Sequence, residues 1–361
     1  AGAQRAIRKL KGEGLLTEPV RVIVAQGDFK LSETLVFTPE DSGTKECPII
    51  FEAAPGATPV FSGGRRIKGF KKDRKGIWKT TIPEVKRGEW YFEQLFVNGR
   101  RALRARTPNQ SAFRMMQPLG KGTDPLTGEE TDLSHRGFIG SATDLKVLKN
   151  FEDAWLVVYH AWEISHSRIA SLDSKSGTLI TTAPACWEMF KWDKQPRYHL
   201  ENFREALDEP GEWFLDRKGT LYYIPLPGED PKTAEVIAPV LERFVEIQGV
   251  ASEGRFVENL TFRGLSFVHG EYRLPESGYQ CPQAAFSLSA AVLADGARDI
   301  HFEDCEIAHI GHYAVWFRNG CRDCSIEKCL IHDMASGGIR IGEPQIRESE
   351  KEHTSHITLD N

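Results

Sequence analysis

The carboxylates near the end of the chain are the first residues of this sequence that suggest chemistry. Glu303 and Glu306 alternate with apolar neighbours and are expected on an outer face, and Asp333 follows His332 where a turn begins. Two carboxylic acids about 5 to 9.5 Å apart on either side of a glycosidic bond can hydrolyse it. Solvated surface charge and turn chemistry explain the same residues, so we treat these three only as candidates for a catalytic pair.

Five other residues are predicted to contact a sugar: Trp162, His166, Trp192, Gln283 and His312. Trp162 and Trp192 lie in two short segments rich in aromatic and polar side chains, and aromatic faces stack on pyranose rings. Gln283 lies beside a long loop between repeats, where loops shape grooves. The tryptophans would also suit a seam between domains and His312 would also suit a turn, so both interpretations stay open.

The sequence predicts no transition metal and no organic cofactor. Its histidines lack ligand spacing such as His-Glu-x-x-His, and Cys321-x-x-Cys324 is a pair without a second pair. A phosphate loop, a dinucleotide fingerprint and a Gly-x-Ser-x-Gly nucleophile motif are absent from the sequence. Structural calcium held by loop carboxylates stays open.

A repeated pattern positions the candidate residues. Apolar residues recur at x, x+2, x+5 and x+7 from three starting points, Leu260, Ile300 and Cys324. The alternation is typical of a strand with one buried face, and the two-residue insert marks a bend. The second and third copies lie 24 residues apart and align Asp299 with Asp323, Phe302 with Ile326, and Cys305 with Cys329.

A repeat of this length indicates a solenoid, because one unit cannot bury its apolar face alone. The repeats have no 3.6-residue period, which excludes helical solenoids, and they lack the Leu-rich consensus of leucine-rich repeats. The sequence therefore predicts an all-β fold, a right-handed parallel β-helix. A β-sandwich with accidental spacing is the alternative.

The chain divides into three predicted regions. Residues 1–77 form an N-terminal cap and the first coils, and residues 241–361 form the later coils. Between them, residues 78–240 lose the period and are predicted to be an inserted β-rich domain, either a sandwich or barrel-like. The cap is a short amphipathic helix whose apolar stripe consists of Ala3, Ala6, Ile7 and Leu10.

Composition narrows the function classes. The 361 residues carry a formal net charge of −5, which argues against a nucleic-acid-binding protein. The longest apolar runs are shorter than the 18 residues of a membrane span, so no membrane partner is predicted. The 7 cysteines are odd in number and lack framework spacing, which argues against a disulfide scaffold.

Short segments spread over nearly the whole chain carry a family resemblance. They are residues 35–44, 61–64, 95–99, 104–109, 210–216, 305–309 and 337–342. With these segments the chain resembles glycoside hydrolase family 141 and its close right-handed β-helix relatives from polysaccharide-degrading bacteria.

This resemblance implies a glycosidase that acts on plant-type or algal polysaccharides and is secreted or periplasmic. Fucosidase and xylanase activities both occur in the family, and a polysaccharide or oligosaccharide is the expected partner. Similar proteins are longer and carry their acids on later coils. We therefore expect the catalytic pair beyond residue 361, the chain alone to be inactive, and the C-terminal part of the same protein to be a further partner.

Two other function classes stay open. A polysaccharide lyase or uronate epimerase would need a base and a charge neutraliser, for which Arg340 with His312 is the hint in this sequence. A non-catalytic carbohydrate-binding protein would need only the sugar contacts. Analysis of the products formed from a polysaccharide separates the three classes.

Overall fold

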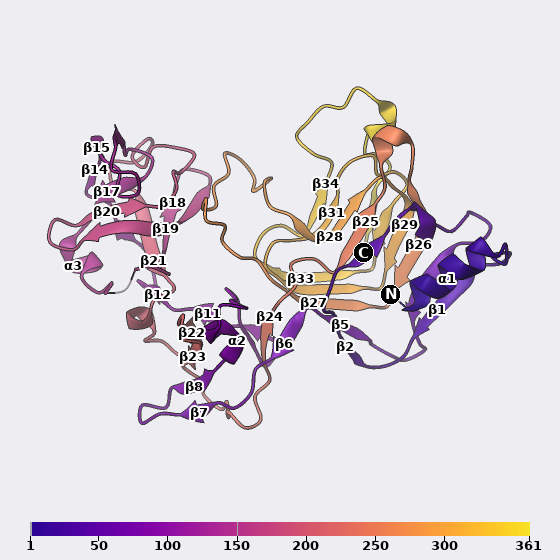
Figure 1. Cartoon of the computed structure of the whole chain (residues 1–361), viewed down its shortest axis with the longest axis horizontal. Coiled ribbons are helices and arrows are strands. Elements are labelled where there is room, and N and C mark those ends of the chain that lie inside the picture. Colours follow the sequence, from indigo (N-terminus) through magenta and orange to yellow (C-terminus); the bar gives the residue numbers. More distant parts are fainter. Residues whose placement is uncertain (1, 150) are drawn as a thin grey trace. The chain divides into compact units, whose positions relative to one another are not determined.

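The computed structural model of the chain describes residues 2–149 and 151–361. The chain divides into two compact units. Unit 1 comprises the chain up to Arg66 together with Ile237–Tyr272 and Leu288–Asn361, and unit 2 comprises Ile67–Val236 and Arg273–Ser287. Figure 1 labels the elements of both units, which are all-β apart from a few short helices.

Unit 1 consists mainly of three parallel sheets, which we call A, B and C (Figure 1). In spatial order, sheet A contains β1 (Val20–Val24), β4 (Ile49–Ala53), β26 (Val257–Arg263), β29 (Ala297–Glu303), β32 (Ser325–Glu327) and β35 (Thr358–Asp360). Sheet B contains β2 (Asp28–Lys30), β5 (Val60–Ser62), β27 (Ser266–Gly270), β30 (Glu306–Ile310) and β33 (Leu330–Met334). Sheet C contains β3 (Leu35–Phe37), β25 (Val245–Gln248), β28 (Ala290–Asp295), β31 (Tyr313–Phe317) and β34 (Ile339–Ile341).

The chain visits these sheets in turn, so that each coil stacks on the preceding one. The predicted register is confirmed where β29 pairs with β32 and places Phe302 opposite Ile326. One coil corner further, the amide of Leu330 donates to the carbonyl of Cys305 at 2.8 Å, and Cys305 is 1% exposed. The cysteine therefore serves as a small apolar residue of the interior.

Stacked aromatic rings fill the space between the sheets. The ring of Phe262 lies 5.6 Å from that of Phe51 and 4.9 Å from that of Phe302, with the planes within 14° of parallel. A second stack joins Phe61 to Phe267 at 5.5 Å. Because residues in register share a face, an aromatic at one x+2 position places the next aromatic directly against it.

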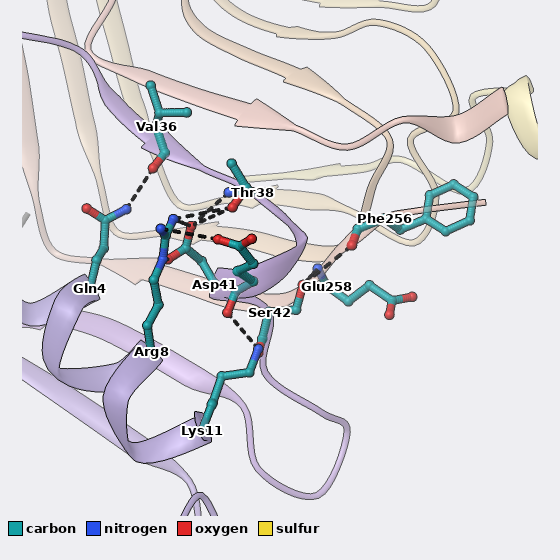
Figure 2. A network of polar contacts seen from close by, with 10 residues as sticks. Gln4, Arg8, Lys11, Val36, Thr38, Asp41, Ser42, Phe256 and Glu258 are labelled. Carbon is teal, nitrogen blue, oxygen red and sulfur yellow. Dashed lines mark hydrogen bonds and ion pairs between the residues drawn. The ribbon is translucent and has the colours of Figure 1, made fainter. Parts of the chain in front are cut away.

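The N-terminal helix α1 (Gly2–Gly12) is attached to the first coil (Figure 2). Its Ile7 enters the hydrophobic core of unit 1. Arg8 donates to both carboxylate oxygens of Asp41, at 2.7 and 2.6 Å, and Asp41 belongs to the 3-10 turn η1 (Pro39–Asp41). β1, β2 and β3 are the edge strands of the three sheets, so the first coil is the end of the stack. The bidentate ion pair therefore holds the helix at that end.

Unit 2 is built from antiparallel pairs together with the parallel pair β11–β22. Its larger sheet runs β12 (Arg106–Thr107), β21 (Arg197–Glu201), β18 (Trp155–Tyr159), β19 (Ile164–Asp173), β20 (Thr178–Thr181), β17 (Gly137–Ile139) and β14 (Gln117–Pro118), and β13 (Phe113–Arg114) also pairs with β21. The second runs β11 (Leu103–Arg104), β22 (Glu212–Leu215), β23 (Thr220–Tyr223), β8 (Trp78–Thr81) and β7 (Lys71–Lys72). The short pairs are β9 (Phe96–Val97) with β10 (Arg100–Arg101) and β15 (Lys121–Thr123) with β16 (Glu130–Asp132).

The remaining short elements are α2 (Pro83–Lys86), α3 (Ala142–Leu145), η2 (Arg204–Ala206), η3 (Ala251–Glu253), η4 (Glu350–Glu352) and the antiparallel pair of β6 (Gly64–Arg66) with β24 (Val236–Pro239).

Each sheet of unit 2 is open at both edges within the described residues, so the barrel form of the predicted insertion is not found. Both segments of unit 2 leave the coils after a strand of sheet B, β5 or β27, and before the next strand of sheet C.

The stack of aromatic rings generates a stability prediction. Phe302 is 0% exposed and contacts Phe262, so Phe302→Ala should lower the free energy of unfolding by about 3–5 kcal/mol. Phe29 is 38% exposed, and Phe29→Ala should cost about 1 kcal/mol or less. Chemical denaturation of both variants measures the difference, and equal losses would contradict the assignment of Phe302 to the centre of the core.

Candidate functional site

A column of polar side chains runs across sheet B in unit 1. The registers of β27, β30 and β33 place His269, His309 and Asp333 at equivalent positions of successive coils. All three residues have positive φ, at 66°, 59° and 51°. The conformation belongs to the backbone of the coil, since Asn259, Asp299 and Asp323 repeat it at equivalent positions along sheet A. The chemistry of the column therefore depends on its side chains.

The side chains of this column contact one another from coil to coil. The hydroxyl of Ser62 lies 3.0 Å from Nδ1 of His269, and the His269 and His309 rings stack 5.3 Å apart with planes within 11°. Nδ1 of His309 lies 2.6 Å from Oδ2 of Asp333. When Nδ1–H of an imidazole donates to a carboxylate, the proton of the neutral ring is held on Nδ1. Nε2 is then the nitrogen that can accept a proton, as in other histidine–aspartate pairs.

Glycine makes room for this column in the preceding coil. A Cβ on Gly63 would lie 2.6 Å from the Phe244 ring and 3.0 Å from the carbonyl of His269. A side chain at that position would push the two strands apart. Gly63 thus permits the approach of Ser62 to His269, which explains one of the sequence segments that carry the family resemblance.

A second histidine–carboxylate pair lies beside the first. Nε2 of His332 is 3.1 Å from Oε1 of Glu306, and the His332 ring meets that of His309 edge to face at 5.7 Å. The carboxylate side chains are partly open to solvent, 37% for Glu306 and 30% for Asp333. The structure therefore brings together two of the three predicted carboxylates, each held by an imidazole on a neighbouring strand.

Glu303 lies in a different environment, on sheet A. It accepts from Nε of Arg263 at 2.7 Å, and Arg263 also reaches Glu52, which in turn pairs with Arg21. The hydrogen bond from Arg21 and the charge of Arg263 hold the pKa of Glu52 below its usual range. This ladder of alternating charges crosses successive strands, so the structure gives Glu303 a surface ion pair.

His312 is 3% exposed, and its Nδ1 lies 3.2 Å from the carbonyl of Tyr313. Burial lowers the pKa of His312 and so favours the neutral form of its ring. The guanidinium of Arg340 lies 3.6 Å from the Trp316 ring centroid and donates to the carbonyl of Leu288 at 3.2 Å. His312 and Arg340 thus make packing contacts and hydrogen bonds to the backbone of unit 1.

Three tryptophans of unit 2 form one aromatic cluster. Trp162 lies 4.7 Å from Trp192 and 6.1 Å from Trp187, and the ammonium of Lys191 lies 4.1 Å from the Trp187 ring. Trp162 is 55% exposed and Trp192 is 41% exposed, so neither is part of a sandwich core. Their open faces suit stacking on a sugar ring.

The other predicted sugar contacts in unit 2 differ in exposure. Gln283 is exposed, and its carbonyl accepts from the thiol of Cys281 at 3.1 Å. His166 is half-buried; its backbone pairs with Tyr279, and its ring packs 5.7 Å from Trp155. Burial lowers the pKa of His166 to about 4, so this ring is neutral in ordinary buffers.

The sequence reasoning did not single out Glu163, although it lies directly beside Trp162. Its side chain is 5% exposed, and Oε1 lies 3.4 Å from Nε2 of His160. Burial raises the pKa of Glu163 to about 7 and lowers that of His160 to about 4. A carboxylic acid that remains protonated near neutral pH is suited to donating a proton, but only its burial reveals this.

A buried ionic cluster was also missed. The guanidinium of Arg104 stacks on Trp155 at 3.8 Å and lies 3.3 Å from Glu201, which accepts from His199 at 2.6 Å. Burial alone would raise the pKa of Glu201, but the hydrogen bond from His199 and the charge of Arg104 outweigh it and lower the pKa to about 2. Arg104 thus contributes to the interior of unit 2.

Among residues 2–149 and 151–361, no group of three or more His, Cys, Asp or Glu side chains is placed to hold a metal ion. None of the helices in the same residues is long and apolar enough to cross a membrane.

Of the comparisons with known proteins, one solved structure supports the fold. No family model and no curated protein matches this chain. A solved structure described as a glycoside hydrolase is similar over 99% of this chain and 68% of its own, with a TM-score of 0.84 and 23% identity. XylC in complex with xylose is similar over 94% of this chain and 51% of its own, at 12% identity, but its TM-score of 0.41 is too low to support an argument. The chain therefore has a glycoside hydrolase-like fold.

Glu163 generates a prediction about pH. Its pKa in the unfolded chain is near the ordinary 4.5 and in the folded protein about 7, so the folded state binds the extra proton between these values. This group therefore contributes a fall in stability on the order of 2 kcal/mol as the pH rises from about 4.5 to 7, whereas the lowered pKa values of His160 and His166 contribute a rise over much of that range. Glu163→Gln should remove the fall, so in denaturation curves the stability of the variant should rise more steeply with pH than that of the unsubstituted chain. Glu188→Gln, at an exposed position of the same unit, is the control and should leave the slope unchanged.

Proposed function

We propose that this chain is a glycosidase that uses Glu306 and Asp333 as its carboxylate pair. The observation that supports the proposal is the pairing of both carboxylates with imidazoles whose rings meet at 5.7 Å. We also infer that unit 1 is a right-handed parallel β-helix, with residues 78–240 as an inserted β-rich domain. The family 141 resemblance and the glycoside hydrolase-like fold support this inference.

In this proposal the two acids have different roles. Asp333, oriented by the 2.6 Å contact with His309, acts on the sugar as nucleophile or as base toward water. Glu306 donates a proton to the departing glycosidic oxygen, and the half-exposed His332 returns a proton to it from solvent. The proposal places both acids within the chain and is an alternative to the expectation that the pair follows residue 361, which stays a prediction.

The exposed tryptophans of unit 2 support a carbohydrate substrate. Trp162 and Trp192 present aromatic faces of the kind that stack on pyranose rings. These tryptophans belong to unit 2, whereas Glu306 and Asp333 belong to unit 1. Fucosylated and xylan-type glycans are the proposed substrates, following the family resemblance. A secreted or periplasmic location would give the protein access to such polymers.

The proposal is tested by replacing each acid. Asp333→Asn and Glu306→Gln should each lower kcat on a cleaved glycan by about 10²–10⁴-fold, because each removes one proton-transfer or nucleophilic step. Glu327→Gln, on β32 of sheet A, is the matched control and should retain activity. Thermal unfolding of each variant separates loss of chemistry from loss of fold. If both variants turn over like the unsubstituted chain, the assignment is wrong and the acids lie elsewhere.

A lyase or epimerase is the second candidate, and the His309–Asp333 pair is the observation that favours it. A histidine oriented by an aspartate can remove the proton next to a uronate carboxylate. A lyase gives an unsaturated product with ultraviolet absorbance, whereas a hydrolase gives reducing ends without it. An epimerase gives neither product but inverts C5 of the uronate residues, and binding with no chemical change in the glycan would favour the non-catalytic class.

A further inference from the structure

A row of two arginines and a tyrosine crosses the larger sheet of unit 2. Arg114 lies directly opposite Arg197 in the β13–β21 pair, and Arg197 lies directly opposite Tyr159 in the β21–β18 pair. Directly opposed residues of antiparallel strands share one face of the sheet. Two guanidinium groups and a phenol ring are therefore neighbours on that face.

Like charges directly opposite each other destabilise a strand pair, so an anion beside these two exposed arginines would relieve a repulsion. The guanidinium of Arg114 donates to the carbonyl of Gln195 at 2.9 Å and lies 3.5 Å from the carboxylate of Asp193. That ion pair is 53% and 55% exposed, so it contributes little. The guanidinium of Arg197 lies 5.4 Å from the Tyr159 ring centroid. Within residues 2–149 and 151–361, one solvated carboxylate thus accompanies these two cations.

The same residues line a cavity. It has a volume of about 350 Å³ and is lined by Ser111, Ala112, Arg114, Tyr159 and Arg197. This volume falls in the usual range of small-ligand sites, about 300–1,000 Å³. Ser111 at its wall has a φ of 67°, a conformation that costs a non-glycine residue about 1 kcal/mol or more.

We propose that this cavity binds a uronate residue of an acidic glycan. Guanidinium groups match the planar carboxylate with paired N–H donors, and the face of Tyr159 offers a surface for the pyranose ring. The choice of a glycan as ligand rests on the proposed function, whereas the preference for an anion rests on the arginine row. The site is one of binding, so it can be measured without turnover.

The test is calorimetric titration of the whole chain with a galacturonate dimer, the neutral galactose dimer and a sulfated galactose dimer, in low salt and at about 0.15 M salt. The galacturonate dimer should bind at least tenfold more tightly than the neutral one. Arg197→Gln and Arg114→Gln should each weaken galacturonate binding about tenfold or more, and Arg197→Lys should restore it only in part. Since the substitutions remove a repulsion, unfolding midpoints should stay the same or rise.

Two further variants complete the design. Arg74→Gln removes an exposed arginine elsewhere in unit 2 and should leave binding unchanged. Ala112→Phe fills the cavity without altering charge and should abolish binding of the uronate. Equal binding of acidic and neutral dimers, equal weakening by Arg74→Gln, or tighter binding of the sulfated dimer would each overturn the proposal. If the chain binds galacturonate but hydrolyses no glycan, the glycosidase proposal is wrong and the binding proposal stands.

Discussion

The stacking of identical positions from coil to coil is the constraint on which unit 1 depends. Parallel strands hydrogen-bonded in register lie roughly 4.8 Å apart, so the side chain at each position meets its counterpart in the next coil. Phe262 therefore packs on Phe302 at 4.9 Å in the interior. The same rule places His269 against His309 at 5.3 Å on sheet B. One geometry thus generates both the apolar core and the polar column, and the residue type at each register position decides which forms.

Residues with positive φ also recur at equivalent positions of successive coils. Asp, Asn and His accept this conformation more readily than other non-glycine residues. Polar side chains are consequently concentrated at these positions for conformational reasons. Asn259, Asp299 and Asp323 form such a column along sheet A, and Gly264, Asp304 and Lys328 form another. Both segments of unit 2 also leave the coils at a corner, the one that follows sheet B.

The repeat made much of unit 1 predictable, because the x, x+2, x+5, x+7 spacing determines which residues share a position in successive coils. The alignment of Phe302 with Ile326 follows from it, as does the approach of His269 to His309. Unit 2 has no repeat, so the pairing of its strands that are distant in sequence could not be derived. Glu163 and the Arg104–Glu201 cluster escaped notice for a related reason: their properties come from burial among residues distant in sequence. A raised or lowered pKa leaves no local signal in a sequence.

Comparison of the columns of positive-φ residues shows why the one on sheet B, which contains His269, His309 and Asp333, is the candidate for chemistry. A column needed only for its backbone conformation requires no complementary partners, and at the Gly264 position it uses residues as different as Gly, Asp and Lys. The sheet B column instead contains two hydrogen-bonded pairs, Ser62 with His269 at 3.0 Å and His309 with Asp333 at 2.6 Å, and the two imidazole rings stack on each other. A second imidazole–carboxylate pair lies against it. Backbone conformation accounts for the presence of polar residues there, but it does not account for the imidazole–carboxylate pairs, which are groups suited to proton transfer.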